Sequence, residues 1–209
     1  MTPVILNHGT WSRETDWHKP GFPMWKMLAD RGYTVLEFKW SGYCGGIPGP
    51  VIVPPSTAQI LGFLQLWKSV GEKLTLFCQR LGLERPHVIS HSHGLQGTMW
   101  SAAGTDFVAP QLFDTVLSLS GPVRPDMQAV RERAVANITK LVQVTDPISD
   151  WTIREGELFG HALAHLGWNY KLPEAHVNID APGHGHSGLT LDISAWTDLG
   201  LLDYFPDVR

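Results

Sequence analysis

The chain has 209 residues, a length that suits one domain with a well-buried core. Hydrophobic residues make up 43% of it, which is ordinary for a globular protein, whereas charged residues make up only 17%, below the usual quarter. The formal net charge of −4 argues against a nucleic-acid partner, because binding to phosphates requires a surplus of basic residues.

The N-terminal residues predict neither a leader peptide nor a membrane anchor. Residues 1–9 lack the basic region and the long apolar core of a signal peptide. No segment is apolar over the length needed to cross a bilayer, so we expect a cytoplasmic protein with no integral membrane association. Cys44 and Cys78 form no metal-binding or redox motif, and we expect two reduced thiols, with a disulfide between them as the alternative.

Short apolar runs alternate with longer helical segments, and this alternation predicts βαβ units and a mostly parallel sheet. Strands are expected at residues 4–7, 34–38, 86–90, 115–119, 139–144 and 175–179. Helices are expected at residues 24–31, 56–81, 94–103, 154–166 and 189–202. No internal repeat or interdomain linker is present, so residues 1–209 are interpreted as a single α/β domain of about six strands. The sequence indicates no oligomeric state.

The junction between the third strand and the third helix carries the strongest functional signal. It reads Ser90-His91-Ser92-His93-Gly94, with a serine at the centre and small residues two positions before and after it. A serine at the top of a sharp strand-to-helix turn projects its hydroxyl from the edge of the sheet, and the crowded turn requires small neighbours. The start of the following helix favours developing negative charge. Ser92 is therefore the predicted nucleophile.

A serine nucleophile needs a base and an acid, which in this chain order follow as Asp or Glu and then His. Asp146 stands at the carboxyl end of the fifth strand, at the same sheet edge as Ser92, and we favour it over Asp150 in the loop beyond. His186 lies in the Gly-rich loop after the sixth strand, directly before a helix start, and we favour it over His184 as the base.

The loops at the same edge supply candidates for an oxyanion hole and a substrate pocket. The backbone N–H of His93, after the nucleophile, is one expected donor, and that of Thr10, in the His8-Gly9 loop after the first strand, is the other. The chain has nine tryptophans. Trp11, Trp40 and Trp151 follow strand ends and are expected to form an apolar pocket for the substrate.

These motifs, in this order, resemble those of the compact α/β-hydrolases of the lipase and esterase group. The resemblance runs from about Val4 to Phe205. It is carried by residues 7–11, 38–42, 90–94, 145–148 and 186–189. Ser90 stands where the nucleophile motif of that group usually has glycine. The resemblance implies a central sheet with helices on both faces, a Ser–His–Asp triad, no cofactor and no large lid domain.

We therefore expect a serine hydrolase that cleaves small-molecule carboxylic esters with short or medium acyl chains. Ser92 would attack the carbonyl, His186 would take its proton, and Asp146 would orient the imidazole. One alternative is a hydrolase with a metal site, because His91 with His93 and His184 with His186 give two H-x-H pairs. Another is a non-catalytic binding protein on the same fold.

Overall fold

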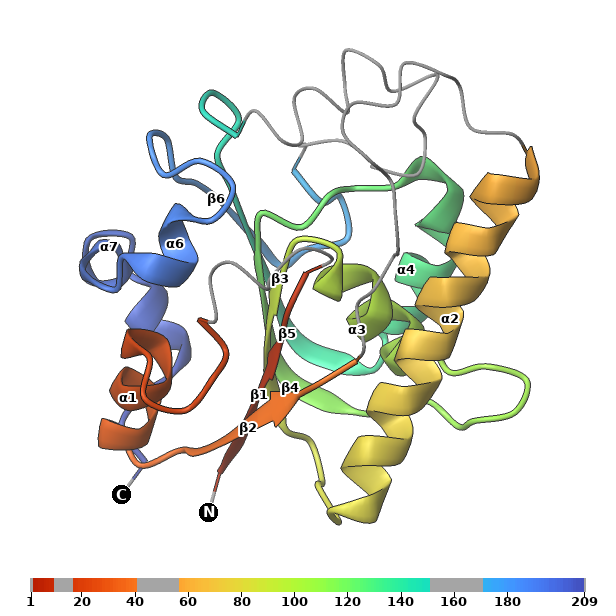
Figure 1. Ribbon diagram of the computed structural model, residues 1–209, viewed down its shortest axis with the longest axis horizontal. Coiled ribbons are helices and arrows are strands. Elements are labelled where there is room, and N and C mark those ends of the chain that lie inside the picture. Colours follow the sequence, from red (N-terminus) through yellow and green to blue (C-terminus); the bar gives the residue numbers. More distant parts are fainter. Residues whose placement is uncertain (1, 10–16, 41–56, 151–170, 209) are drawn as a thin grey trace.

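The computed structural model describes residues 2–9, 17–40, 57–150 and 171–208, and of residues 57–64 only the helical backbone. Its centre is one sheet of six strands, all parallel, in the order β2-β1-β3-β4-β5-β6 (Figure 1). The strands are β1 (Pro3–Asn7), β2 (Thr34–Phe38), β3 (His87–His91), β4 (Phe113–Leu119), β5 (Ile138–Thr145) and β6 (Val177–Asp180). The predicted parallel sheet of six strands is confirmed.

Helices cover both faces of the sheet, as expected (Figure 1). One face carries α2 (Thr57–Arg80), α3 (Gly94–Ala103) and α4 (Gln128–Val135). The other carries α1 (Pro23–Asp30), α6 (Gly188–Leu191) and α7 (Ser194–Asp198). Short 3-10 turns, η2 (Pro125–Met127) and η3 (Leu201–Tyr204), join or follow these helices.

Successive strand residues point to opposite faces, and this alternation divides the core into two clusters. Ile5 and Val88 pack with Trp67 of α2 in one cluster. Their neighbours Leu6 and Ile89 pack in the other cluster, beneath α1 and the C-terminal helices. Burying one such aliphatic side chain contributes roughly 2 kcal/mol, so the continuous apolar runs of the central strands hold both helical layers to the sheet.

The predicted C-terminal helix at 189–202 is wrong as a single element, because the structure divides it into α6, α7 and η3. Asp192 interrupts it: its Oδ1 accepts the backbone N–H of Ser194 at 3.0 Å, so this carboxylate starts a new helix. Gly200, in the left-handed conformation with φ +66°, ends the second piece. The sequence also missed α4, and the helix predicted at 154–166 lies outside the described residues.

No helix in the described part of the chain is long and apolar enough to span a membrane. Cys78 is a free thiol in the core beside α3, and burial raises its pKa to about 12. Cys44 falls outside the described residues.

The order of the strands determines where a site can form. The chain passes from β1 outward to β2 and then returns to β3 on the other side of β1. At such a reversal the loops leaving two neighbouring strands run in opposite directions and open a crevice at the carboxyl ends of the strands. Residues 7–9 leave β1 and residues 91–94 leave β3 at this point.

Candidate active site

Ser92 occupies a sharp turn between β3 and α3. Its φ is +52°, in the left-handed region that residues other than glycine rarely adopt. Its backbone N–H donates to the carbonyl oxygen of Leu119 at the end of β4, at 3.0 Å. The strained turn is thus tied to the neighbouring strand, and it holds the Ser92 side chain above the carboxyl edge of the sheet.

Two glycines make room for this turn. A Cβ on Gly9 would lie 2.7 Å from Cβ of Ser92, and a Cβ on Gly94 would lie 2.5 Å from the carbonyl oxygen of Asn7. Neither distance is tolerated by real Cβ atoms. The loop leaving β1 therefore lies directly against the turn at Ser92, as the His8-Gly9 pair predicts.

Ser90 fills the position where glycine is more usual, and the structure shows how its hydroxyl is accommodated. Its Oγ hydrogen-bonds Oγ1 of Thr98 in α3 at 2.7 Å. Nδ2 of Asn7 donates to the same Oγ1 at 2.9 Å and to the carbonyl oxygen of Gly94 at 2.8 Å. This buried network joins β1, β3 and α3 beneath Ser92, so the polar residue costs no unsatisfied hydrogen bond.

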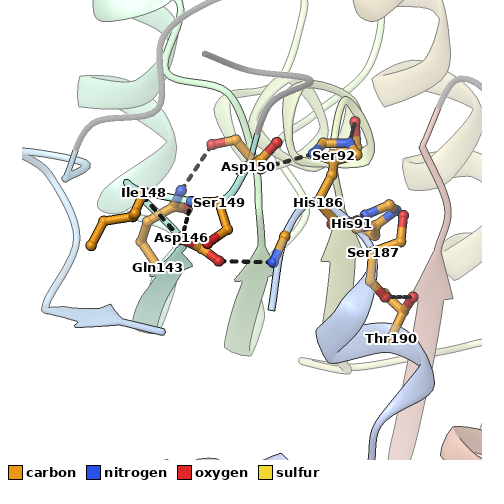
Figure 2. Close-up of polar contacts among 12 residues, drawn as sticks. His91, Ser92, Gln143, Asp146, Ile148, Ser149, Asp150, His186, Ser187 and Thr190 are labelled. Carbon is orange, nitrogen blue, oxygen red and sulfur yellow. Dashed lines mark hydrogen bonds and ion pairs between the residues drawn. The ribbon is translucent and has the colours of Figure 1, made fainter. Parts of the chain in front are cut away.

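Ser92, His186 and Asp150 form a continuous hydrogen-bonded relay (Figure 2). Oγ of Ser92 lies 2.9 Å from Nε2 of His186, and Nδ1 of His186 lies 2.9 Å from Oδ2 of Asp150. Because an ionised carboxylate only accepts, Nδ1 carries the proton and Nε2 is left to accept from the serine hydroxyl. The side chain of Asp150 is fully buried.

The carboxylate that accepts the Nδ1–H of His186 is therefore that of Asp150 and not that of Asp146, which the sequence favours. The preference for Asp146 is corrected for a geometric reason. Its side chain turns toward backbone N–H groups: Oδ1 accepts those of Ile148 and Ser149, and Oδ2 accepts that of Gly185 (Figure 2). The choice of His186 over His184 agrees with the relay, because His186 faces Ser92.

His91 also contacts His186. Its Nε2–H donates to the carbonyl oxygen of His186 at 2.8 Å, and the two rings pack with centroids 4.9 Å apart. Burial, reinforced by the neighbouring imidazole of His186, lowers the pKa of His91 to about 3. His91 is therefore neutral and adds no positive charge beside His186. Sequence reasoning missed this contact of His91, although the position of His91 directly before the predicted nucleophile Ser92 was a signal.

Of the remaining predicted site residues, the structure describes only His93 and Trp40. His93 begins α3, and its ring stacks on Trp67 at a centroid distance of 5.1 Å. Thr10, Trp11 and Trp151 lie outside the described residues. Trp40 is only 2% exposed, and its Nε1 donates to Oδ1 of Asn7 at 3.0 Å. The expectation that Trp40 lines a substrate pocket is corrected, because its indole packs in the core and donates a hydrogen bond to the end of β1.

In the described part of the chain, the two H-x-H pairs are not part of a cluster that could bind a metal ion. His91 packs edge-on against Trp17 in one core cluster, whereas His93 stacks on Trp67 in the other, so the turn separates them. Among the described residues, no group of three or more His, Cys, Asp or Glu side chains could hold a metal ion.

Comparison with known proteins finds similarity in structure but not in sequence. No protein-family model matches the chain, and no curated protein sequence matches it significantly. Two crystal structures are similar in fold, each with 12% sequence identity. One is a protein described as a predicted CIB-like hydrolase from Thermoplasma acidophilum, with a TM-score of 0.59 over 99% of this chain and 87% of the other. The second is the mature lipase BlEst2 of Bacillus licheniformis, with a TM-score of 0.52 over 95% and 91%. With the six parallel strands and the turn at Ser92, these likenesses show that the chain has the α/β-hydrolase fold, as the resemblance of its motifs implied.

Proposed function

We propose that the protein is a serine hydrolase that cleaves carboxylic esters, with Ser92 as nucleophile, His186 as base and Asp150 as acid. The observation that carries the proposal is the relay itself, with both of its hydrogen bonds at 2.9 Å and the nucleophile on a strained turn at the edge of the sheet. A nucleophile within hydrogen-bond reach of a base, which a third group orients, is the arrangement that nucleophilic catalysis requires.

In the proposed reaction, His186 takes the proton of Ser92 through Nε2 as Oγ attacks the ester carbonyl. Asp150 keeps the proton on Nδ1 and stabilises the imidazolium that forms. The C–O bond to the alcohol breaks, and His186 returns the proton to the departing oxygen. Water, activated by the same imidazole, then cleaves the acyl ester on Ser92 and restores the free hydroxyl.

The developing oxyanion needs donors fixed beside Ser92. The backbone N–H of His93 is one, because it stands at the start of α3, where the positive end of the helix dipole favours negative charge. Thr10 is the proposed second donor, since Gly9 before it already lies against Ser92. Losing one such donor costs roughly 3 kcal/mol of transition-state stabilisation.

The proposed substrates are uncharged esters with short or medium acyl chains. The low content of charged residues suits an apolar substrate, and both similar structures are of proteins named a hydrolase or a lipase. Trp11 and Trp151, which follow the first and fifth strands in the sequence, remain the proposed aromatic lining of the pocket.

A fluorophosphonate probe tests the nucleophile, and a panel of p-nitrophenyl esters tests the reaction. The wild type should be labelled at Ser92 and should hydrolyse the acetate and butyrate faster than the palmitate. Ser92→Ala should abolish both, whereas Ser194→Ala, a change at a surface serine of α7, should alter neither. A wild type that is not labelled would favour a binding protein on this fold, and labelling that persists in Ser92→Ala would overturn the assignment.

A further inference from the structure

Asp146 is a buried carboxylate that the proposed reaction does not use. It follows the last residue of β5 and is only 1% exposed. Its Oδ1 accepts the backbone N–H of Ile148 at 3.0 Å and that of Ser149 at 2.7 Å. Its Oδ2 accepts the backbone N–H of Gly185 at 2.8 Å. One side chain therefore joins two loops that are far apart in the sequence. The first loop holds Asp150 and the second holds His186, 36 positions later.

The donors have a specific relation to the relay. Ser149 is the residue directly before the acid, and Gly185 is the residue directly before the base. The two oxygens of Asp146 thus hold, one each, the backbone N–H groups of the residues that directly precede Asp150 and His186. The loops also lie against each other here, because a Cβ on Gly185, whose φ is +61°, would lie 3.6 Å from the carbonyl oxygen of Ser149.

The charge of Asp146 suits this role. Burial alone would raise the pKa of its carboxyl, but the backbone N–H groups of Ser149, Gly185, Ile148 and His184 outweigh that cost and lower it below the usual value. The carboxylate is consequently ionised at neutral pH, so both of its oxygens accept hydrogen bonds. An asparagine would offer only one accepting oxygen, and its amide would face an N–H donor on the other side.

We propose that Asp146 is a positioning residue, which fixes the separation between the acid Asp150 and the base His186 by bridging the backbones of their two loops. The proposal rests on the proposed triad and adds a residue that touches neither the substrate nor the reacting atoms. Without the bridge, the loops would move relative to each other, and the hydrogen bond between Nδ1 of His186 and Asp150 would lengthen. Because reacting groups tolerate little displacement, a shift of about 1 Å can cost about 100-fold in rate.

The test combines Asp146→Asn with Asp150→Asn, singly and together, and measures the rate of fluorophosphonate labelling along with kcat and KM for p-nitrophenyl butyrate. Asp146→Asn should lower kcat and the labelling rate by about 10- to 100-fold and leave KM within about twofold, because the triad and not the pocket is displaced. In the Asp150→Asn background the same change should cost less than about threefold, since there is no longer an acid to position.

Controls separate this role from a loss of folding. Asp192→Asn removes a carboxylate that also accepts a backbone N–H, but in an exposed turn, and it should leave the rates unchanged. Circular dichroism measures the folded fraction of each variant. Asp146→Glu, which keeps the charge and displaces the carboxylate, serves where Asp146→Asn does not fold, and it should show the same selective loss of kcat.

The outcomes distinguish the two proposals. A wild type that the probe does not label at Ser92 contradicts the proposed function itself. If the wild type is labelled and a folded Asp146 variant reacts as fast as the wild type, or if its loss is equally large without Asp150, the bridge has no positioning role. A loss larger than that of Asp150→Asn would instead return the role of acid to Asp146.

Discussion

In the proposed triad, replacing Asp150 with asparagine should disable His186 as the base while leaving the fold intact. The side chain is fully buried and lies 2.9 Å from Nδ1 of His186, so the carboxylate opposes the positive charge that His186 gains in the transition state. Two unit charges roughly 4 Å apart interact by about 4 kcal/mol at an effective dielectric constant of about 20. Because each 1.36 kcal/mol is a factor of ten, losing this interaction should lower kcat/KM by about 1000-fold.

The tautomer adds to this loss. An asparagine can present its amide to Nδ1, which would place the imidazole proton on Nε2, where it cannot accept from Ser92. The total should then approach about 10,000-fold. The assay is kcat/KM for p-nitrophenyl acetate and butyrate, with thermal unfolding to verify the fold. A folded Asp150→Asn variant that retains a tenth or more of the wild-type value would refute the assignment.

Four further predictions concern residues around the triad. Gly9→Ala should slow labelling of Ser92 by 100-fold or more, because the new Cβ would lie 2.7 Å from Cβ of Ser92; near-normal labelling would show that the loop yields. His91→Phe should lower kcat by about tenfold while the free energy of unfolding changes little, because the change removes both the bond to His186 and a buried, unpartnered Nδ1. His91→Gln, which retains a donor, should recover part of the rate, and equal rates for the two variants would contradict the role of that bond. Trp40→Phe should lower the melting temperature without altering the preference for acyl-chain length, and an altered preference in the ester panel would restore Trp40 to the pocket. The lowered pKa of Asp146 contributes stability that is present above about pH 4 and is lost as the pH falls through the folded-state value; melting temperatures of wild type and Asp146→Asn should therefore converge as the pH falls below about 4, and parallel curves would argue against it.

Most of the sheet was predictable because its central strands are buried on both faces. Val4, Ile5 and Leu6 are consecutive, fully buried residues, and such runs between longer helical segments are typical of parallel strands. The C-terminal helix was not predictable from its periodicity. The carboxylate of Asp192 accepts the backbone N–H and the hydroxyl of Ser194, and these bonds compete with the helix. Hydrophobic spacing carries no information about that competition.

The location of the candidate site at the carboxyl edge of the sheet was predictable, but the choice between the two aspartates was not. Parallel strands end at one edge, which was enough to bring the segments of Ser92, His186 and the two aspartates together. The choice between Asp146 and Asp150 depends on how the loop turns. Asp146 precedes a proline and accepts N–H groups two and three residues on, as an aspartate at the first position of a turn does. The Asp146-Pro147 pair was therefore a signal that this carboxylate serves the backbone.

His186, the proposed base, is held at three points by residues that end β3 or lie in the segment after β5. Nδ1 of His186 bonds Asp150 and the preceding N–H bonds Asp146, both in the segment that leaves β5, while the carbonyl oxygen bonds His91, the last residue of β3. In the sheet, β4 lies between β3 and β5, so the ends of these two strands are fixed relative to each other. The last residue of β4, Leu119, also accepts the backbone N–H of Ser92. The loop after β6 therefore needs no regular structure of its own to present an imidazole accurately. Substitutions should accordingly lower activity most at the residues that end or follow β3 and β5. Among the glycines around His186, substitution should have its largest effect where the backbone N–H donates a hydrogen bond, as that of Gly185 does to Asp146.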